Sequence, residues 1–274
     1  MAHGGTAVVT PERVELSLVP GTDPDAAFEV ASVTKLLTTM AALAAVDRGQ
    51  LALDQKIQGD EHGATVRHLL AHASGLPFEE GATSRRPLGK RRIYSNTGFR
   101  VLGEVVADAV GLSFENWLRS AVLDPLGMAS TQLLARNRKQ PDPAAGAAST
   151  LADLVKLARC LLGQGAPLLS PELFAEATSV QFPGLAGLVP GVGRFDPCDW
   201  GLGFELRDAK HPHWMGERRS AAAFGHFGAT GCFLWVDPAG PVPVAAVAVS
   251  DRWFDDGRWG MAVWPGWSDS VSTV

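Results

Sequence analysis

The chain contains 274 residues, of which 46% are hydrophobic and 19% charged, and its formal net charge is -5. This length allows one large domain or two interlocked lobes around a full hydrophobic core. Because the composition shows no dominant basic surface, we expect neither nucleic acid nor a membrane as a partner.

The first residues lack the features of a secretory leader. Met1 to Thr10 contain no cationic stretch followed by a long apolar run, so we expect no signal peptide, no anchor and a cytoplasmic location. Two runs rich in strand-forming residues, Ala7 to Thr10 and Arg13 to Val19, then predict a β-hairpin.

The elements that follow are mainly helical. The apolar run from Ser32 to Asp47 predicts a long helix with Ser32 at its N-terminus. Further helices are predicted at Thr65 to His72, Ser95 to Ala109, Phe114 to Leu126, Ser149 to Gly163 and Ser170 to Thr178. Strand composition returns in Gly201 to Leu206, Cys232 to Val236 and Val242 to Ser250.

This order of elements predicts the fold class. Because the middle is helical and both ends are β-rich, we expect an α/β (α+β) fold with an antiparallel sheet built from both chain ends and flanked by helices. Residues 1–60 plus 195–274 would form the sheet-containing lobe, and residues 61–194 an inserted helical lobe in the same structural unit. The active site is expected in the cleft between them.

Ala31-Ser32-Val33-Thr34-Lys35 places a hydroxyl and an amine one helical turn apart. Positions i and i+3 share a helix face, and a helix N-terminus favours developing negative charge. Apolar neighbours would desolvate the Lys35 amine and lower its pKa, which makes a neutral lysine base for Ser32 plausible. The alternative is an N-cap serine beside a solvated lysine, because S-x-x-K arises by chance in roughly one such chain in three.

Two further segments carry candidate site residues. Tyr94, the only tyrosine, lies with Ser95 and Asn96 at a predicted loop-to-helix junction. Its phenol can pass the serine proton to a leaving group, whereas Asn96 can hold the lysine or a substrate amide, and the alternative for Tyr94 is a core filler. The glycine-rich run from Phe224 to Gly231 is expected to supply an edge-strand N–H that forms an oxyanion hole with the Ser32 N–H.

We expect no metal and no cofactor. His68 and His72 have the i, i+4 spacing of metal ligands, but no third ligand is evident and Leu69 stands where H-E-x-x-H requires glutamate. No phosphate-binding or dinucleotide-binding fingerprint occurs in a convincing context. The three cysteines are scattered, without C-x-x-C spacing, and are expected to be free thiols.

Five cations, Arg85, Arg86, Lys90, Arg91 and Arg92, precede Tyr94. Such a run is usually a solvated face. As a second hypothesis, Arg91 and Arg92 receive an anionic substrate at the mouth of the cleft, in which case neutralising them raises KM for acidic acyl donors only.

With Ser32-Val33-Thr34-Lys35, Tyr94-Ser95-Asn96 and His226-Phe227-Gly228 in this order, the chain resembles the serine β-lactamase and penicillin-binding-protein superfamily. The Tyr-Ser-Asn motif makes it similar to the branch of class C β-lactamases, D-alanyl-D-alanine carboxypeptidases, esterases and transacylases. The resemblance implies the following roles: Ser32 as acylated nucleophile, Lys35 and Tyr94 as the proton-transfer pair, Asn96, His226 and Gly228 as positioning or substrate-binding groups, and the Ala229 N–H as second oxyanion donor.

The chain departs from that pattern in two places. His226 replaces a lysine often found in the third motif, which weakens the case for an efficient β-lactamase. The residues after Ser250 are too few for the long helix that usually packs on the sheet. They carry Trp253, Trp259, Trp264 and Trp267 instead, which either pack, wall the cleft or bury a subunit contact.

We therefore predict a serine acyl-transfer enzyme. It would be a cytoplasmic esterase, amidase or transacylase that moves an acyl group from a small-molecule ester or amide to water, or to an amine or alcohol acceptor in small-molecule biosynthesis. The alternatives are a β-lactamase or D-alanyl-D-alanine carboxypeptidase, and a non-catalytic ligand-binding module of the same fold. The presence of Ser32, Lys35 and Tyr94 together argues against the binding module.

Overall fold

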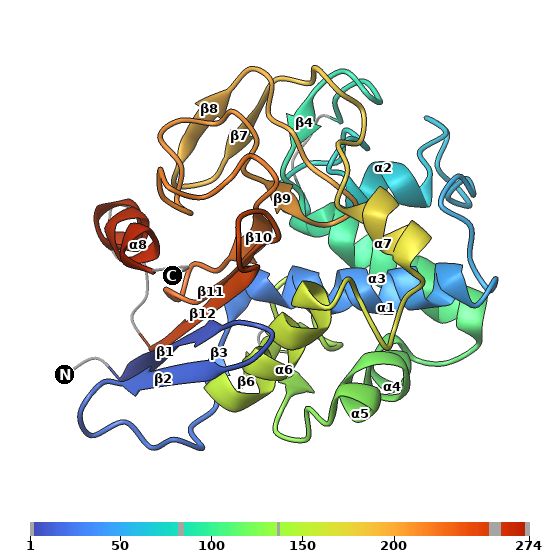
Figure 1. Cartoon of the computed structure of the whole chain (residues 1–274). Coiled ribbons are helices and arrows are strands. Elements are labelled where there is room, and N and C mark those ends of the chain that lie inside the picture. The colour runs from blue at the N-terminus through green and yellow to red at the C-terminus, as the bar shows by residue number, and fades with distance from the viewer. Residues whose placement is uncertain (1–2, 82–84, 136–137, 252–258, 272–274) are drawn as a thin grey trace.

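The computed structural model describes residues 3–81, 85–135, 138–251 and 259–271. Its largest sheet has six antiparallel strands in the order β2-β1-β12-β11-β10-β9 (Figure 1). The strands are β1 (Gly4–Val9), β2 (Val14–Leu18), β9 (Glu205–Leu206), β10 (Phe224–Phe227), β11 (Phe233–Asp237) and β12 (Val244–Ser250). Both chain ends contribute to it, so the predicted fold class and the N-terminal hairpin are confirmed.

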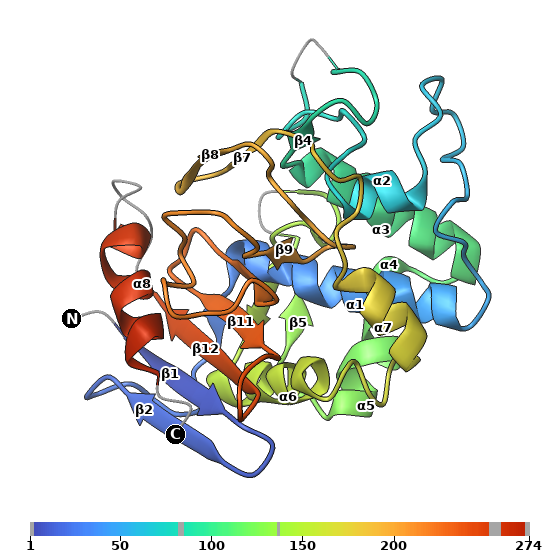
Figure 2. The same ribbon diagram turned by 45° about the horizontal axis from the view of Figure 1, so that its top comes forward.

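Helices cover both faces of this sheet (Figure 2). Side chains alternate along β11, so that Leu234 belongs to the main core under α1 (Thr34–Asp47) and α6 (Leu151–Leu162), whereas Phe233 faces α8 (Trp259–Ser270). The Trp264 and Phe233 ring centroids lie 5.7 Å apart. The expectation that the C-terminal segment is too short for a packing helix was wrong, and Trp264 is a packing residue; Trp253 lies outside the described residues.

Helix α1 lies at the centre of the helical part of the molecule, in contact with η1 (Ala31–Val33), α3 (Asn96–Val110), α4 (Phe114–Leu118) and the π-helical η2 (Arg119–Leu123). Every residue from Thr34 to Ala45 is buried, which explains why this helix reads as a continuous apolar run without a polar stripe. The other helices are α2 (Val66–Leu70), α5 (Asp124–Leu126) and α7 (Pro171–Ala177). Among the described residues, none of the helices is sufficiently long and apolar to span a membrane.

Two small sheets contain the strands that directly precede the first two sequence motifs. One consists of β3 (Phe28–Glu29), β6 (Ala147–Ser149) and β5 (Gln132–Leu133), and the other of β4 (Arg92–Ile93), β7 (Gly187–Val189) and β8 (Gly193–Phe195). Ser149 ends β6, and Thr150 caps α6 by accepting a hydrogen bond from the Asp153 N–H, so the predicted cap was wrong by one residue. His226 lies within β10 and not in a turn: it pairs with Leu234 of β11, whereas β9 pairs only with Phe224 and Gly225.

Candidate active site

Ser32 lies in η1, immediately before α1. The preceding residue, Ala31, has φ +44°, a left-handed conformation that a non-glycine residue adopts only when its surroundings enforce it. The Ser32 N–H belongs to the first turn of a helix, where backbone N–H groups have no intrahelical acceptor. The Ser32 side chain caps neither η1 nor α1, so the structure contradicts the N-cap alternative.

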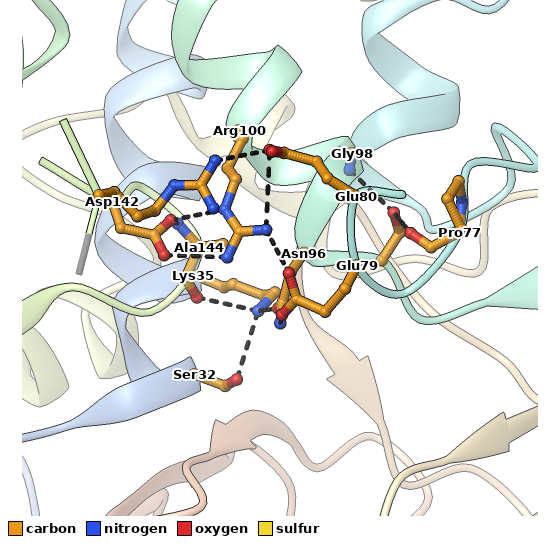
Figure 3. A network of polar contacts seen from close by, with 12 residues as sticks. Ser32, Lys35, Pro77, Glu79, Glu80, Asn96, Gly98, Arg100, Asp142 and Ala144 are labelled. Atoms are coloured by element: carbon orange, nitrogen blue, oxygen red, sulfur yellow. Dashed lines mark hydrogen bonds and ion pairs between the residues drawn. The ribbon is translucent and has the colours of Figure 1, made fainter. Parts of the chain in front are cut away.

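The Lys35 amine has three hydrogen-bond partners. Its Nζ lies 3.3 Å from Ser32 Oγ, 2.6 Å from Asn96 Oδ1 and 2.9 Å from the Ala144 carbonyl oxygen (Figure 3). The side chain has no exposed surface. Burial lowers the pKa of Lys35 to about 7, although the Asp142 carboxylate nearby opposes the shift. Lys35 is therefore not a solvated surface lysine, and Asn96 contacts it, which is one of the two contacts predicted for Asn96.

The acceptors of Lys35 are themselves held by a second group of charged side chains. Asn96 Nδ2 donates to Glu79 Oε1 at 2.6 Å, and the other oxygen of Glu79 accepts from Arg100. Arg100 also donates to both carboxylate oxygens of Asp142, at 3.1 and 3.0 Å. Asp142 Oδ1 in turn accepts the Ala144 N–H at 2.9 Å, which fixes the loop whose carbonyl faces Lys35.

These contacts close a ring of hydrogen bonds that begins and ends at Lys35, as Figure 3 shows. Sequence reasoning missed Glu79, Arg100 and Asp142. The i, i+4 spacing of Asn96 and Arg100 on α3 was the one available signal, because such residues share a helix face. Burial by itself would raise the pKa of the Asp142 carboxyl. The hydrogen bonds from Arg100 lower this pKa by more, so its net value is lowered and the carboxyl stays ionised.

The Tyr94 hydroxyl lines the same cavity as Ser32 and His226. It contacts His226 Nε2 at 3.4 Å. Its ring lies beneath the lysine, with Lys35 Nζ 4.7 Å from the ring centroid. Burial raises the Tyr94 pKa well above its ordinary value, so this phenol is protonated at neutral pH and is a proton donor, not an anionic base.

His226 is neutral in this environment. Its Nδ1 lies 2.7 Å from the Phe227 carbonyl oxygen, so Nδ1 carries the hydrogen and Nε2 is left as an acceptor for the Tyr94 hydroxyl. Burial, together with the nearby Lys35 charge, lowers the His226 pKa to about 3. The side chain therefore places no positive charge where a lysine would.

The backbone of the third motif packs against the backbone of the segment that carries Ser32. A Cβ atom added to Gly228 would lie 2.3 Å from the Val30 carbonyl oxygen and 3.2 Å from the Ser32 nitrogen, so only glycine fits here. Among the described residues, the Ala229 N–H forms no backbone hydrogen bond. Two N–H groups, those of Ser32 and Ala229, are thus available at one cavity.

This cavity has a volume of about 220 Å³ and mostly apolar walls. It is lined by Ser32, Phe78, Tyr94, Val189, Pro190, Gly191, Trp200, His226, Phe227 and Ala229. Trp200 was not singled out from the sequence as a site residue, because its segment has no motif of its own. The predicted residues Ser32, Tyr94, His226 and Ala229 meet here, while Lys35 and Asn96 lie behind them.

The arginine run divides into residues with different environments. Arg85 pairs with Asp60, and Arg86 and Arg91 are exposed. The Arg92 guanidinium is buried and donates to the carbonyl oxygens of Ala71, Gln181, Phe182 and Cys198. Because Arg92 ties three loops together, the structure contradicts the hypothesis that it receives a substrate anion.

The remaining candidates have roles within the protein. His68 and Thr65 form a capping box at the start of α2, and His72 Nδ1 accepts the Ser95 N–H. Within the described part of the chain, no group of three or more potential metal ligands occurs. All three cysteines are buried and free.

Three features are typical of serine enzymes with a β-lactamase fold: the antiparallel sheet, the central apolar helix, and a serine hydrogen-bonded to a buried lysine. The chain belongs to the beta-lactamase family, whose model matches residues 4–263. A solved β-lactamase from Mycobacterium bovis is 43% identical with a TM-score of 0.88 over 98% of this chain and 93% of that one.

Two further comparisons are more distant. Penicillin-binding protein 4* of Bacillus subtilis is 26% identical in an alignment 139 positions long that covers 40% of this chain and 31% of that protein, so the match spans under a third of its length. EstCE1, a hydrolase with promiscuous acyltransferase activity, superposes with a TM-score of 0.77 at 17% identity over 96% of this chain and 93% of that one. That likeness concerns the fold alone.

Proposed function

We propose that the protein is a serine hydrolase or acyltransferase that forms an acyl-enzyme on Ser32. The observation that carries the proposal is the 3.3 Å contact between Ser32 Oγ and the fully buried Lys35 amine, whose pKa is lowered to about 7. An amine that is largely neutral at physiological pH can accept the serine proton. A purely structural lysine would not need to be held in this state beside a hydroxyl.

The proposed acylation gives each group a defined role, and the proton that Lys35 takes from Ser32 is passed on through Tyr94. Ser32 Oγ attacks the carbonyl carbon of the substrate while Lys35 Nζ takes the serine proton. The oxyanion that forms accepts hydrogen bonds from the N–H groups of Ser32 and Ala229. The Tyr94 hydroxyl gives its proton to the leaving oxygen or nitrogen, and the Lys35 ammonium returns a proton to the phenolate. Water, an amine or an alcohol then attacks the acyl-enzyme by the same steps in reverse.

The walls of the cavity favour esters with apolar acyl groups. Phe78, Trp200 and Phe227 offer aromatic surface, and neutral His226 supplies no cation for a carboxylate next to the reacting carbonyl. This argues for an esterase or transacylase over an efficient β-lactamase or carboxypeptidase. The 43% identity to the β-lactamase from Mycobacterium bovis keeps β-lactam hydrolysis as the second candidate.

Intact-protein mass spectrometry tests the proposal directly. After mixing with activated esters or a penicillin, the wild type is expected to gain the mass of one acyl group, and Ser32→Ala none. Discharge of the adduct by water identifies a hydrolase, and discharge only by an added amine or alcohol identifies a transacylase. Absence of an adduct from every donor, or the same adduct on Ser32→Ala, would contradict the proposal and support the binding module.

The rate of acylation is expected to follow the neutral fraction of Lys35. Because the neutral amine is the base, the rate of the single-turnover burst rises about tenfold per pH unit below pH 7 and levels off above it. The His226 pKa, about 3, adds no second inflection between pH 5 and 9. A rate independent of pH over that interval would exclude Lys35 as the base.

A further inference from the structure

A second cavity, of about 510 Å³, lies beside the first. The two cavities share Phe78, Tyr94 and Pro190 in their walls. The second one lies over the small sheet in which β4 pairs with β7 and β7 with β8. That pairing sets Arg194 of β8 opposite Leu188, and it brings Arg91, which precedes β4, to the same cavity.

The lining of this second cavity contains four arginines and no carboxylate. Arg92 is occupied by backbone carbonyls, but Arg86, Arg91 and Arg194 are exposed and, within the described residues, make no side-chain hydrogen bond or ion pair. By contrast, Arg67, Arg85 and Arg100 pair with carboxylates. In a chain with a formal net charge of -5, three unneutralised guanidinium groups around one cavity are a local excess of positive charge.

The cavity also presents apolar surface between these cations and the first cavity. Phe78 and Leu188 are 50% and 53% exposed, among the largest exposures of hydrophobic side chains in the described structure. A bound molecule that covered them would gain the free energy of burying that surface. The site therefore matches a ligand with an apolar segment that ends in an anionic group, such as a carboxylate or a phosphate ester.

We propose that this second cavity binds an anionic group, a carboxylate or a phosphate ester, at the far end of the acyl donor. The proposal rests on the proposed function, since it places the reacting carbonyl at Ser32. An apolar spacer would contact Phe78 and Leu188, and the terminal oxyanion would accept hydrogen bonds from Arg86, Arg91 and Arg194. The planar guanidinium fork matches both carboxylate and phosphate oxygens.

A matched pair of substrates tests the proposal. Mono-4-nitrophenyl glutarate and 4-nitrophenyl butyrate share the leaving group and a short acyl chain, but only the former carries a terminal carboxylate. Arg91→Gln and Arg194→Gln are each expected to lower kcat/KM for the glutarate ester about fivefold, and for the butyrate ester by less than twofold. Added salt should reduce the preference of the wild type for the glutarate ester.

Arg119→Gln provides the control, because Arg119 is exposed and remote from both cavities. It should leave the rates with both esters unchanged. Equal losses with the two esters in Arg91→Gln and Arg194→Gln, or no loss with either, would overturn the proposal.

Binding to the Ser32→Ala variant separates this proposal from the proposed function. Calorimetric titration with hexanoate and with monobutyl phosphate requires no acylation, and it distinguishes a carboxylate from a phosphate ester. The subsite is supported if either probe binds the Ser32→Ala variant and binds more weakly once Arg91→Gln and Arg194→Gln are introduced into it. This result would hold even if no ester acylates the wild type. Equal affinity with and without these arginines would refute the subsite while leaving acylation of Ser32 intact.

Discussion

Replacement of Lys35 by methionine is expected to slow acylation of Ser32 by about 10²–10⁴-fold without unfolding the protein. Methionine fills a similar apolar volume next to Tyr94 and Phe99 but cannot accept a proton. The measurement is the burst rate with an activated ester at pH 8, where the wild-type lysine is mostly neutral. A variant that acylates at the wild-type rate would exclude Lys35 from the reaction.

The same variant also tests the pKa of Lys35, because a lowered pKa makes the free energy of unfolding depend on pH. The folded protein holds the Lys35 pKa at about 7, below the value of 10.5 for a free lysine, so between these limits the unfolded chain binds one more proton. The free energy of unfolding of the wild type, relative to Lys35→Met, should then rise by about 1.4 kcal/mol per pH unit between pH 7 and 10. Urea unfolding at pH 7 and 9 measures this difference, and exposed Lys56→Met is the control that should show none.

Replacement of Arg100 by methionine is expected to lower the free energy of unfolding by about 3 kcal/mol and to change the pH profile of acylation. The substitution leaves the Asp142 and Glu79 carboxylates without their shared cation. Because the Arg100 charge lowers the Lys35 pKa whereas the two carboxylates raise it, the profile should shift to higher pH. Arg100 is thus expected to be a positioning residue that acts on Ser32 through Lys35.

Two further variants separate the effect of charge from that of structure. Arg100→Lys keeps the positive charge but loses the two-pronged contact with Asp142, so the pH profile should stay near that of the wild type while stability falls. Arg100→Met combined with Asp142→Asn removes the unpaired carboxylate and should lose less stability than the two single changes added together. An unaltered pH profile in Arg100→Met would show that the ring has no influence on the lysine.

The parts of the site that could be predicted are those fixed by local geometry. Ser32 and Lys35 are three residues apart on one helical segment, and Ser95 caps α3 so that Asn96 follows a defined turn. Both arrangements depend on helix periodicity and capping, which the sequence shows directly. The family resemblance then placed His226 and Ala229 at the same cavity.

The parts that could not be predicted depend on contacts between distant segments. Asp142 lies in a connector rich in proline and alanine, 42 positions from Arg100, and nothing in either segment marks the pair. The arginine run looks uniform, although pairing of β4 with β7 holds Arg92 buried among backbone carbonyls while Arg91 stays exposed. Helix α8 contains Pro265 and Gly266, which obscure its helical pattern, and packing of Trp264 on the sheet outweighs that propensity.

The pairing of β1 with β12 also has a consequence for the synthesis of the protein. The hydrogen bond from the His3 N–H to Asp251 next to these strands joins residues separated by 248 positions. A hairpin of β1 and β2 can form early on the ribosome, but its inner edge stays unpaired until β12 has emerged. Gly228 and β10 contact the turn that carries Ser32. We therefore expect the nucleophile to reach its final position late in folding, after the C-terminal strands have joined the sheet.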